Sequence, residues 1–371
     1  MLKVKFNGDR SNSKTNKNYL FSLFETVSHF VHQHFISLLL VCYGLAVICP
    51  GFGLHIRNLS LGNFNLLGEK VSLSAPVLML SFLLFNAGFG IKATELQQLK
   101  NKPIILVAGL LGNTLTPIIF ILLVWACVIH WHNLDEAQNV LVGLALIASM
   151  PIAGSSTAWS QNANGNLAIS IGLVLLSTIF SPLITPSILQ SASSITLGDY
   201  AEDLTELAQT GIKTFLIISV VIPILLGAIL RILLKEQHGK TATVWLKAIN
   251  SIILLLLIYS NAAVCLPQTI AKPDWDFLIL ILIITVLLCL TMFIAGYVTA
   301  KIFNSNHDDL VALVFGLGMN NNGTGLVLAS TQLSDHPAVL LPIVFYNLIQ
   351  HLIAGAIYSI LARKPINDFQ Q

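Results

Sequence analysis

The chain has 371 residues, of which 55% are hydrophobic and only 10% are charged, whereas an average soluble domain carries about 25% charged residues. Its formal net charge of +2 is too small to indicate a nucleic-acid partner. The composition excludes an ordinary soluble domain and predicts an all-α polytopic membrane protein, because a helix satisfies its own backbone hydrogen bonds in lipid. The lipid bilayer is therefore the partner that the composition itself indicates.

Ten apolar runs are long enough to cross a bilayer, which takes about 20 helical residues. They cover residues 35–56, 71–91, 103–129, 140–161, 167–189, 208–234, 244–265, 277–302, 310–329 and 338–361. Lysine and arginine accumulate in cytoplasmic loops. With the N-terminus inside, 15 of the 19 Lys and Arg residues fall on the cytoplasmic side. This alternation predicts a multi-pass protein of the cell (inner) membrane with both termini in the cytoplasm.

Five predicted spans precede an acidic segment and five follow it. An odd number of spans in each half predicts two repeats of inverted topology. The expected units are a cytoplasmic N-terminal segment (1–34), a first five-helix repeat (35–190), an acidic external loop (191–207), a second five-helix repeat (208–362) and a cytoplasmic tail (363–371). Apolar residues at helical spacing between Leu20 and Val31 predict an amphipathic helix on the inner membrane surface.

Glycine, proline and uncharged polar residues interrupt the fourth and the ninth predicted spans in matching places. The first interruption reads Met150-Pro151-Ile152-Ala153-Gly154-Ser155-Ser156-Thr157, and the second runs from Gly316 to Gly325. Non-helical backbone survives at membrane depth only where it lines a protein cavity. A matched pair of broken helices is typical of the binding site of a secondary transporter. The alternative is that small residues here let two helices cross closely.

Candidate binding residues cluster at these two interruptions. A helix that restarts near Ser155 presents free backbone N–H groups and the positive end of its dipole, which favours a small organic anion as substrate. Neutral side-chain oxygens in the same segments suit a hard cation or substrate hydroxyls. They belong to Ser155, Ser156, Thr157, Ser160, Asn320, Asn321, Asn322 and Thr324.

Other polar residues inside or beside the spans leave two interpretations open. Asn113 in the third span either lines the cavity or hydrogen-bonds to another helix. His351 in the tenth span either contacts substrate, with a charge that changes near physiological pH, or bonds to a neighbouring helix. The histidines at 29, 32 and 34 and the pair His130 and His132 have metal-like spacings. They fall at interfaces, so we expect them to face solvent or headgroups.

The positions of the acidic residues argue against other functions. All 17 Asp and Glu residues can be placed in loops, tails or span edges, whereas proton and sodium antiporters usually need a buried carboxylate. The spans also hold no nucleophile beside a base, no paired carboxylates and no metal motif, so an enzyme is not expected. We expect no cofactor apart from a possible sodium ion.

Residues 43–358 resemble the bile acid:sodium symporter family. The most specific match runs without a gap through Met150-Pro151 to Ser156, Gly165-Asn166, Ser170, Ser177-Thr178, Ser181-Pro182 and Thr185-Pro186. Further support comes from Phe89-Gly90, from Gly318-Met319 with Asn321 and Gly323, and from His351 with Gly355. The resemblance implies ten transmembrane helices in two inverted five-helix repeats, with discontinuous fourth and ninth helices that cross.

The resemblance also implies sodium ligands near this crossing. Ser156 and Ser170 match the expected hydroxyl ligands, Thr157 replaces an Asn, and Asn320 stands where the family has Gln. Gly316 occupies the place of a Glu that serves both sodium sites of the family. Val174 and Gly112 replace a Thr and a Gln. Because these changes remove one anionic and two neutral ligands, sodium coupling does not follow from the resemblance.

We therefore expect a secondary active transporter that moves an organic anion by alternating access around the crossover site. One alternative is a sodium-independent facilitator or exporter of the same fold. An alternative of another class is a membrane receptor or scaffold that does not transport.

Overall fold

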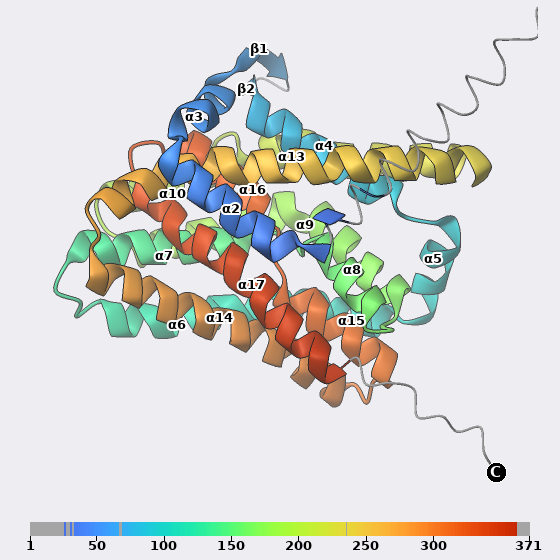
Figure 1. The fold of residues 1–371 in the computed structure, drawn as a ribbon. Helices are drawn as coiled ribbons and strands as arrows, with labels where there is room; N and C mark the ends of the chain where they lie inside the picture. The colour runs from blue at the N-terminus through green and yellow to red at the C-terminus, as the bar shows by residue number, and fades with distance from the viewer. Residues whose placement is uncertain (1–25, 27–29, 32, 67–68, 235, 362–371) are drawn as a thin grey trace, which may run out of the picture.

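The computed structural model describes residues 26, 30–31, 33–66, 69–234 and 236–361 (Figure 1). Nearly all of the predicted amphipathic helix and the whole of the predicted cytoplasmic tail lie outside these residues. Among the described residues, six helices are long and apolar enough to cross a membrane, or seven if one bent pair counts as a single span. The described residues are therefore largely helical and consistent with a polytopic α-helical membrane protein.

The first predicted span, 35–56, is not one straight helix. It folds as α2 (Phe35–Ile48) and α3 (Pro50–Asn58), which meet at an angle of 92°. Pro50 stands at the first position of α3, where its missing N–H does no harm. Tyr259 holds the bend, because its hydroxyl donates to the carbonyl of Cys49 and accepts from the N–H of Gly53 at 3.1 Å.

A β-hairpin replaces the beginning of the second predicted span. Strands β1 (Ser60–Leu66) and β2 (Glu69–Ser74) pair antiparallel, and α4 (Ala75–Phe89) follows directly. The prediction of a span from residue 71 is wrong at this end, because residues 71–74 belong to β2. Pro76 in the first turn of α4 favours the helix start that the structure shows.

The middle of the chain consists of α5 (Ala93–Gln98), the short helix η1 (Leu99–Asn101), α6 (Pro103–Val128), α7 (Leu134–Ser149), α8 (Ser155–Asn162) and α9 (Leu167–Ser193). The acidic segment expected as a loop instead forms α10 (Asp199–Gln209) over most of its length, with Leu204 and Leu207 buried. The sixth predicted span begins at α11 (Ile212–Leu216), after Gly211 with a φ of 75°. It continues through a π-helical turn, η2 (Ile217–Val221), into α12 (Ile222–Leu233).

The second half continues with α13 (Glu236–Ala271), α14 (Trp275–Ile302), α15 (His307–Gly318), α16 (Asn322–Gln332), η3 (Pro337–Val339) and α17 (Leu340–Leu361). The helices pack in two groups. Figure 1 shows α3, α4 and α13 of the first group at the top and α6, α14 and α15 of the second group at the bottom. In the first group α12 packs on α4, and α13 packs on α2, α3 and α4. In the second group α14 packs on α6, α15 and α17, and α7 packs on α6, α9 and α17.

Two glycines allow close packing within the first group. A Cβ on Gly88 would lie 1.9 Å from the carbonyl oxygen of Ile224, and a Cβ on Gly227 would lie 2.0 Å from that of Phe85. No larger residue fits at either position without moving backbone, so α4 and α12 form a close helix pair through small residues.

Candidate functional site

Two non-helical segments cross inside the protein. Residues 150–154 separate α7 from α8, and residues 319–321 separate α15 from α16. The N–H of Ala153 donates to the carbonyl of Met319 at 2.9 Å, and the N–H of Asn321 donates to that of Pro151 at 2.8 Å. Ile152 and Asn320 thereby form an isolated antiparallel bridge. The predicted interruptions do break both helices, and the two breaks meet as a pair of short antiparallel strands, which we call the crossing.

Neighbouring side chains bind the backbone groups that the breaks leave free. The Asn320 side-chain amide donates to the carbonyl of Ile147 at 3.1 Å, and the Thr185 hydroxyl donates to that of Ser149 at 2.6 Å. These bonds cap the end of α7, whose last carbonyls have no helical partner. The Ser177 hydroxyl of α9 also accepts from the N–H of Ile152 at 3.0 Å.

A chain of polar side chains connects the crossing to α2. Gln350 on α17 accepts from the backbone N–H of Asn320 at 3.1 Å and donates to the side-chain oxygen of Asn347 at 3.4 Å. Asn347 in turn donates to the hydroxyl of Tyr43 at 3.4 Å. Gln350 and Asn347 are not among the residues predicted for the site. Their role could not be found from sequence, because the partner of Gln350 is a backbone group made free by the break.

Other buried polar atoms at the crossing have no hydrogen-bond partner among the described residues. They are the hydroxyl of Ser156, the side-chain oxygen of Asn320, both side-chain polar atoms of Asn322 and the hydroxyl of Thr324. All four residues are at most 1% exposed. Leaving such a group unpaired costs about 1–3 kcal/mol, so these atoms point to a ligand, an ion or water bound between the broken helices.

The remaining residues of the two breaks lie at the same helix starts but have other surroundings. Ser155 is exposed, and the Thr157 hydroxyl donates to the carbonyl of Gly154 at 2.7 Å. The Asn321 side chain caps α16 by accepting from the N–H of Thr324 at 3.3 Å. Thr157 and Asn321 therefore have structural contacts that leave further lone pairs free.

Four predicted site residues lie on neighbouring turns or helices, and no hydrogen bond among the described residues joins their side chains to the crossing. Ser160 lies at the far end of α8 beneath Gly165, whose N–H donates to the Ser160 carbonyl at 2.7 Å. Ser170 is on α9 and Asn113 on α6; each is buried with one side-chain oxygen unpaired. His351 on α17 is buried with Nδ1 unpaired and lies edge-on to the Phe35 ring, 4.9 Å between centroids.

The surroundings of Gly316 indicate whether the protein has the carboxylate ligand that the family uses for sodium. A Cβ at this position on α15 would lie 2.9 Å from a methyl carbon of Leu173 on α9. The space that a carboxylate side chain would need is therefore taken by an apolar side chain. The oxygens at the other positions that match sodium ligands of the family, on Ser156, Ser170 and Asn320, are all neutral. These residues do not reproduce the sodium site of the bile acid:sodium symporters, which uses a carboxylate.

A cavity of about 320 Å³ lies away from the crossing, where α6 and α9 begin. Its lining comprises Gln98, Leu99, Lys102, Leu106, Asn166, Ala168 and Ile169. Lys102 forms an ion pair with the buried carboxylate of Asp309 at the start of α15. Asn166 donates to the other oxygen of Asp309 at 2.8 Å. This cluster joins the starts of three helices, α6, α9 and α15.

A helical membrane protein in which two interrupted helices meet through buried, partly unpaired polar groups has the architecture of a secondary transporter. The sequence model of the SBF-like CPA transporter family matches residues 33–363, and the chain belongs to this family. The predicted likeness to the bile acid:sodium symporters is thereby confirmed.

Two proteins of Bacillus subtilis (strain 168) are similar to the chain. The uncharacterized protein YbaS is 25% identical over 232 residues, which cover 62% of this chain and 72% of YbaS. The uncharacterized sodium-dependent transporter YocS is 22% identical over 294 residues, which cover 79% of this chain and 84% of YocS. Family membership and a relative named as a transporter place the chain among transport proteins and not among enzymes.

Proposed function

We propose that the protein is a secondary active transporter of a small organic anion, which binds at the crossing and passes by alternating access. The observation that carries this proposal is a set of fully buried side-chain atoms, on Ser156, Asn320, Asn322 and Thr324, that have no hydrogen-bond partner in the described part of the chain. A protein whose only need was to let two helices cross would gain stability by replacing these groups with apolar ones.

The chemistry of the crossing supports an anion. Helices α8 and α16 both begin there, and helix starts carry a partial positive charge and free N–H groups. The side-chain amide of Asn322 supplies an additional unpaired donor. The segments 150–162 and 316–332 contain no acidic residue that would repel an anion.

We propose ten spans in two inverted five-span repeats, in the cell membrane with both termini cytoplasmic. Matching elements support the repeat: α7 and α15 each start after an asparagine that caps the helix, Asn133 and Asn306, and each breaks before a shorter helix. The distribution of Lys and Arg supports the orientation. The short helix α4, which is apolar but below the length of the six clear spans, would cross as the second span.

The two packing groups are the parts of the protein that would move against each other during transport. We propose that the group of α2, α3, α4, α12 and α13 rocks against the group that carries the crossing, as one bundle against another. The hydrogen bonds from Asn347 to Tyr43 and from Gln350 to Asn347 then connect the moving group to Gln350, which accepts from the backbone N–H of Asn320.

For the coupling, we propose that transport does not depend on sodium bound by a carboxylate, because Leu173 fills the space beside Gly316. A second candidate is sodium symport through neutral oxygens alone. The oxygens of Ser156, Ser170 and Asn320, which have no partner among the described residues, favour it, as does the name of YocS as a sodium-dependent transporter.

A binding and flux experiment tests these proposals. The purified full chain is screened by thermal unfolding against carboxylates, sulfonates and sulfates, with bile acids among them, in sodium and in potassium buffers. A ligand that binds only the folded state raises the unfolding temperature. Anions that do so are then assayed for uptake into liposomes with and without a sodium gradient.

The outcomes separate the candidates. Anion uptake that is indifferent to sodium supports the first candidate, and uptake driven by the gradient supports symport through neutral oxygens. Binding without flux indicates a receptor or scaffold instead. If organic cations and not anions stabilise the protein, the assignment of the substrate class is wrong.

A further inference from the structure

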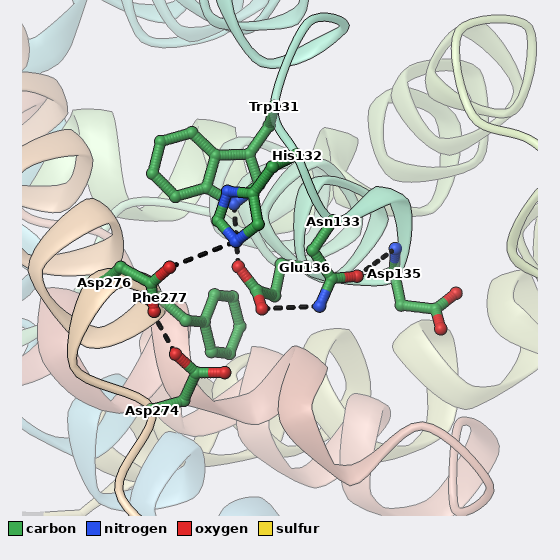
Figure 2. A network of polar contacts seen from close by, with 8 residues as sticks. All are labelled: Trp131, His132, Asn133, Asp135, Glu136, Asp274, Asp276 and Phe277. Carbon is green, nitrogen blue, oxygen red and sulfur yellow. Dashed lines mark hydrogen bonds and ion pairs between the residues drawn. The ribbon is translucent and has the colours of Figure 1, made fainter.

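A second polar cluster lies where the loop after α6 meets the start of α14 (Figure 2). His132 precedes α7, Glu136 is in the first turn of α7, and Asp276 is in the first turn of α14. Ring nitrogen Nε2 of His132 lies 3.1 Å from Oδ2 of Asp276. One donor atom from each of the three residues lies within 4.8 Å of the others. None of these residues takes part in the crossing.

Glu136 is the fixed member of this cluster. It is only 6% exposed, and Trp131 Nε1 donates to its Oε2 at 2.7 Å while Asn133 Nδ2 donates to its Oε1 at 2.6 Å (Figure 2). Each carboxylate oxygen keeps a second lone pair. Hydrogen bonds of this kind orient metal ligands in proteins. The side chains of His132 and Asp276, 61% and 53% exposed, have the freedom to turn toward Glu136.

The cluster has more negative charge than its own residues compensate. Asp274, which caps α14, forms a hydrogen bond with Asp276 (Figure 2). The cluster thus has two carboxylates and one imidazole, and a third carboxyl group lies beside Asp276. Their combined negative charge attracts a cation.

The chain has a second carboxylate at the equivalent position of another helix, and there a lysine neutralises it. Glu136 and Asp309 occupy the same position, the third residue of a helix that follows a capping asparagine. Asp309 meets the ammonium of Lys102, the residue directly before α6. The residue directly before α14 is Asp274, an acid. Beside Asp309 the chain therefore supplies a cation, whereas beside the cluster of Glu136 it supplies a further carboxyl group.

We propose that His132, Glu136 and Asp276 bind a divalent transition-metal ion such as Zn²⁺, which fills the place that Lys102 has at the other cluster. An imidazole with two carboxylates is a ligand set that zinc accepts, with the fourth position left to water. Mg²⁺ and Ca²⁺ prefer oxygen ligands throughout. The bound ion ties the start of α7, which leads into the crossing, to the start of α14.

This inference departs from the expectation drawn from the pair His130 and His132. Only His132 takes part, so the spacing of the two histidines is irrelevant. Asp276 lies in a distant part of the chain, and no sequence pattern connects it with His132. The fold brings them together, because α6 and α14 pack side by side.

Metal titration of the full chain tests the proposal. The protein carries an affinity tag without histidine, is stripped with EDTA in detergent, and is titrated calorimetrically with ZnCl₂, MgCl₂ and CaCl₂. We expect saturable one-to-one Zn²⁺ binding that His132→Ala and Asp276→Asn each weaken at least tenfold. His130→Ala, an exposed histidine outside the cluster, is the matched control and should bind like the parent.

Thermal unfolding in EDTA shows whether the variants are folded, and both substituted side chains are exposed, so we expect unchanged unfolding temperatures. The proposal fails if no Zn²⁺ binds below millimolar concentration, or if His132→Ala binds as tightly as His130→Ala. It also fails if Mg²⁺ or Ca²⁺ binds as well as Zn²⁺ and is insensitive to His132→Ala, since that result indicates only attraction to an acidic surface. The test needs no transport substrate, so its outcome is independent of the proposed function.

Discussion

Individual residues at the crossing divide into two sets with different tasks. Thr185, Ser177 and Gln350 bind backbone groups that the helix breaks leave free. Ser156, Asn322 and Thr324 are equally buried but have no partner within the described part of the chain. If this division is functional, substitutions in the first set should reduce stability, and substitutions in the second should reduce binding.

The first prediction compares one residue from each set. Thr185→Val leaves the carbonyl of Ser149 buried and unpaired, which should lower the free energy of unfolding by about 1–3 kcal/mol. Ser156→Ala removes a hydroxyl that has no partner, so the ligand-free protein should be at least as stable as the parent. Its binding of the stabilising anion should be weaker. Thermal unfolding with and without that anion measures both effects; a destabilised, ligand-free Ser156→Ala would show that the hydroxyl has a structural role.

The second prediction concerns Gly316. Gly316→Glu alone should be destabilised, because its Cβ would lie 2.9 Å from Leu173. Combining it with Leu173→Ala gives the carboxylate room and should produce a protein that sodium stabilises more than potassium does. The control is Gly316→Gln with Leu173→Ala, which has the same shape without the charge. Equal responses to sodium in the two double variants would mean that the missing carboxylate is not what distinguishes this protein from the symporters.

At the residue scale, sequence reasoning located the crossing but not the division of tasks. Proline, glycine and asparagine in apolar runs marked both breaks, because few other residues tolerate unwound backbone in a membrane. The chemistry of Thr185 or Gln350 depends on which carbonyl or N–H another helix leaves free. That information exists only after the helices have packed.

Among the elements, α6, α9 and α15 begin at one buried ion pair. Asp309 is 2% exposed, whereas Lys102 is one-third exposed, so the carboxylate is the group that depends on its partner. Removing one member of a buried pair leaves an uncompensated charge, which is more damaging than removing both.

The third prediction follows from this asymmetry. Lys102→Met should lower the free energy of unfolding by about 3–5 kcal/mol, and adding Asp309→Leu should restore part of the loss. Lys100→Met is the control, since Lys100 is exposed two residues earlier. A double-mutant cycle followed by thermal unfolding measures the coupling. Additive effects of the two substitutions would show that the pair contributes nothing.

At the element scale, apolar runs predicted where helices lie better than where they bend or end. The long helices α6, α9 and α14 fall where hydropathy places spans. The bend at Cys49, the hairpin of β1 and β2 and the amphipathic helix α10 were missed. Hydropathy averages over many residues, whereas a bend held by Tyr259 or a helix start set by Pro76 depends on single contacts.

At the scale of the whole molecule, the division of the helices into two packing groups is the feature that matters most for transport. They touch at Gly154, at the end of the first break, and Ala87 on α4: a Cβ on Gly154 would lie 3.5 Å from the Cβ of Ala87. This separation falls within the range of about 3.5–4.5 Å that disulfides require.

The fourth prediction uses this contact. Ala87→Cys with Gly154→Cys, made in a background where the exposed Cys49 and Cys127 are replaced by serine, should form a disulfide across the two groups. Oxidation should abolish anion uptake and reduction should restore it, because the groups can no longer move apart. Each single-cysteine variant serves as control. Full uptake by the oxidised protein would exclude relative motion of the two groups at this point.

The division into two groups could not be derived from the sequence, although ten runs and two breaks could. Which helices pack together is decided by contacts such as those of Gly88 and Gly227, and such glycines look the same in a sequence whichever helix they face. The resemblance to a known family implies that the fourth and ninth helices cross, which periodicity alone does not predict.

The hydrogen bonds of the crossing have a consequence for evolution. Ala153 with Met319, and Asn321 with Pro151, are joined only through main-chain atoms, which every amino acid possesses except for the N–H of proline. Descendants of a common ancestor can therefore diversify the side chains at this junction and acquire new cargo while the junction itself persists.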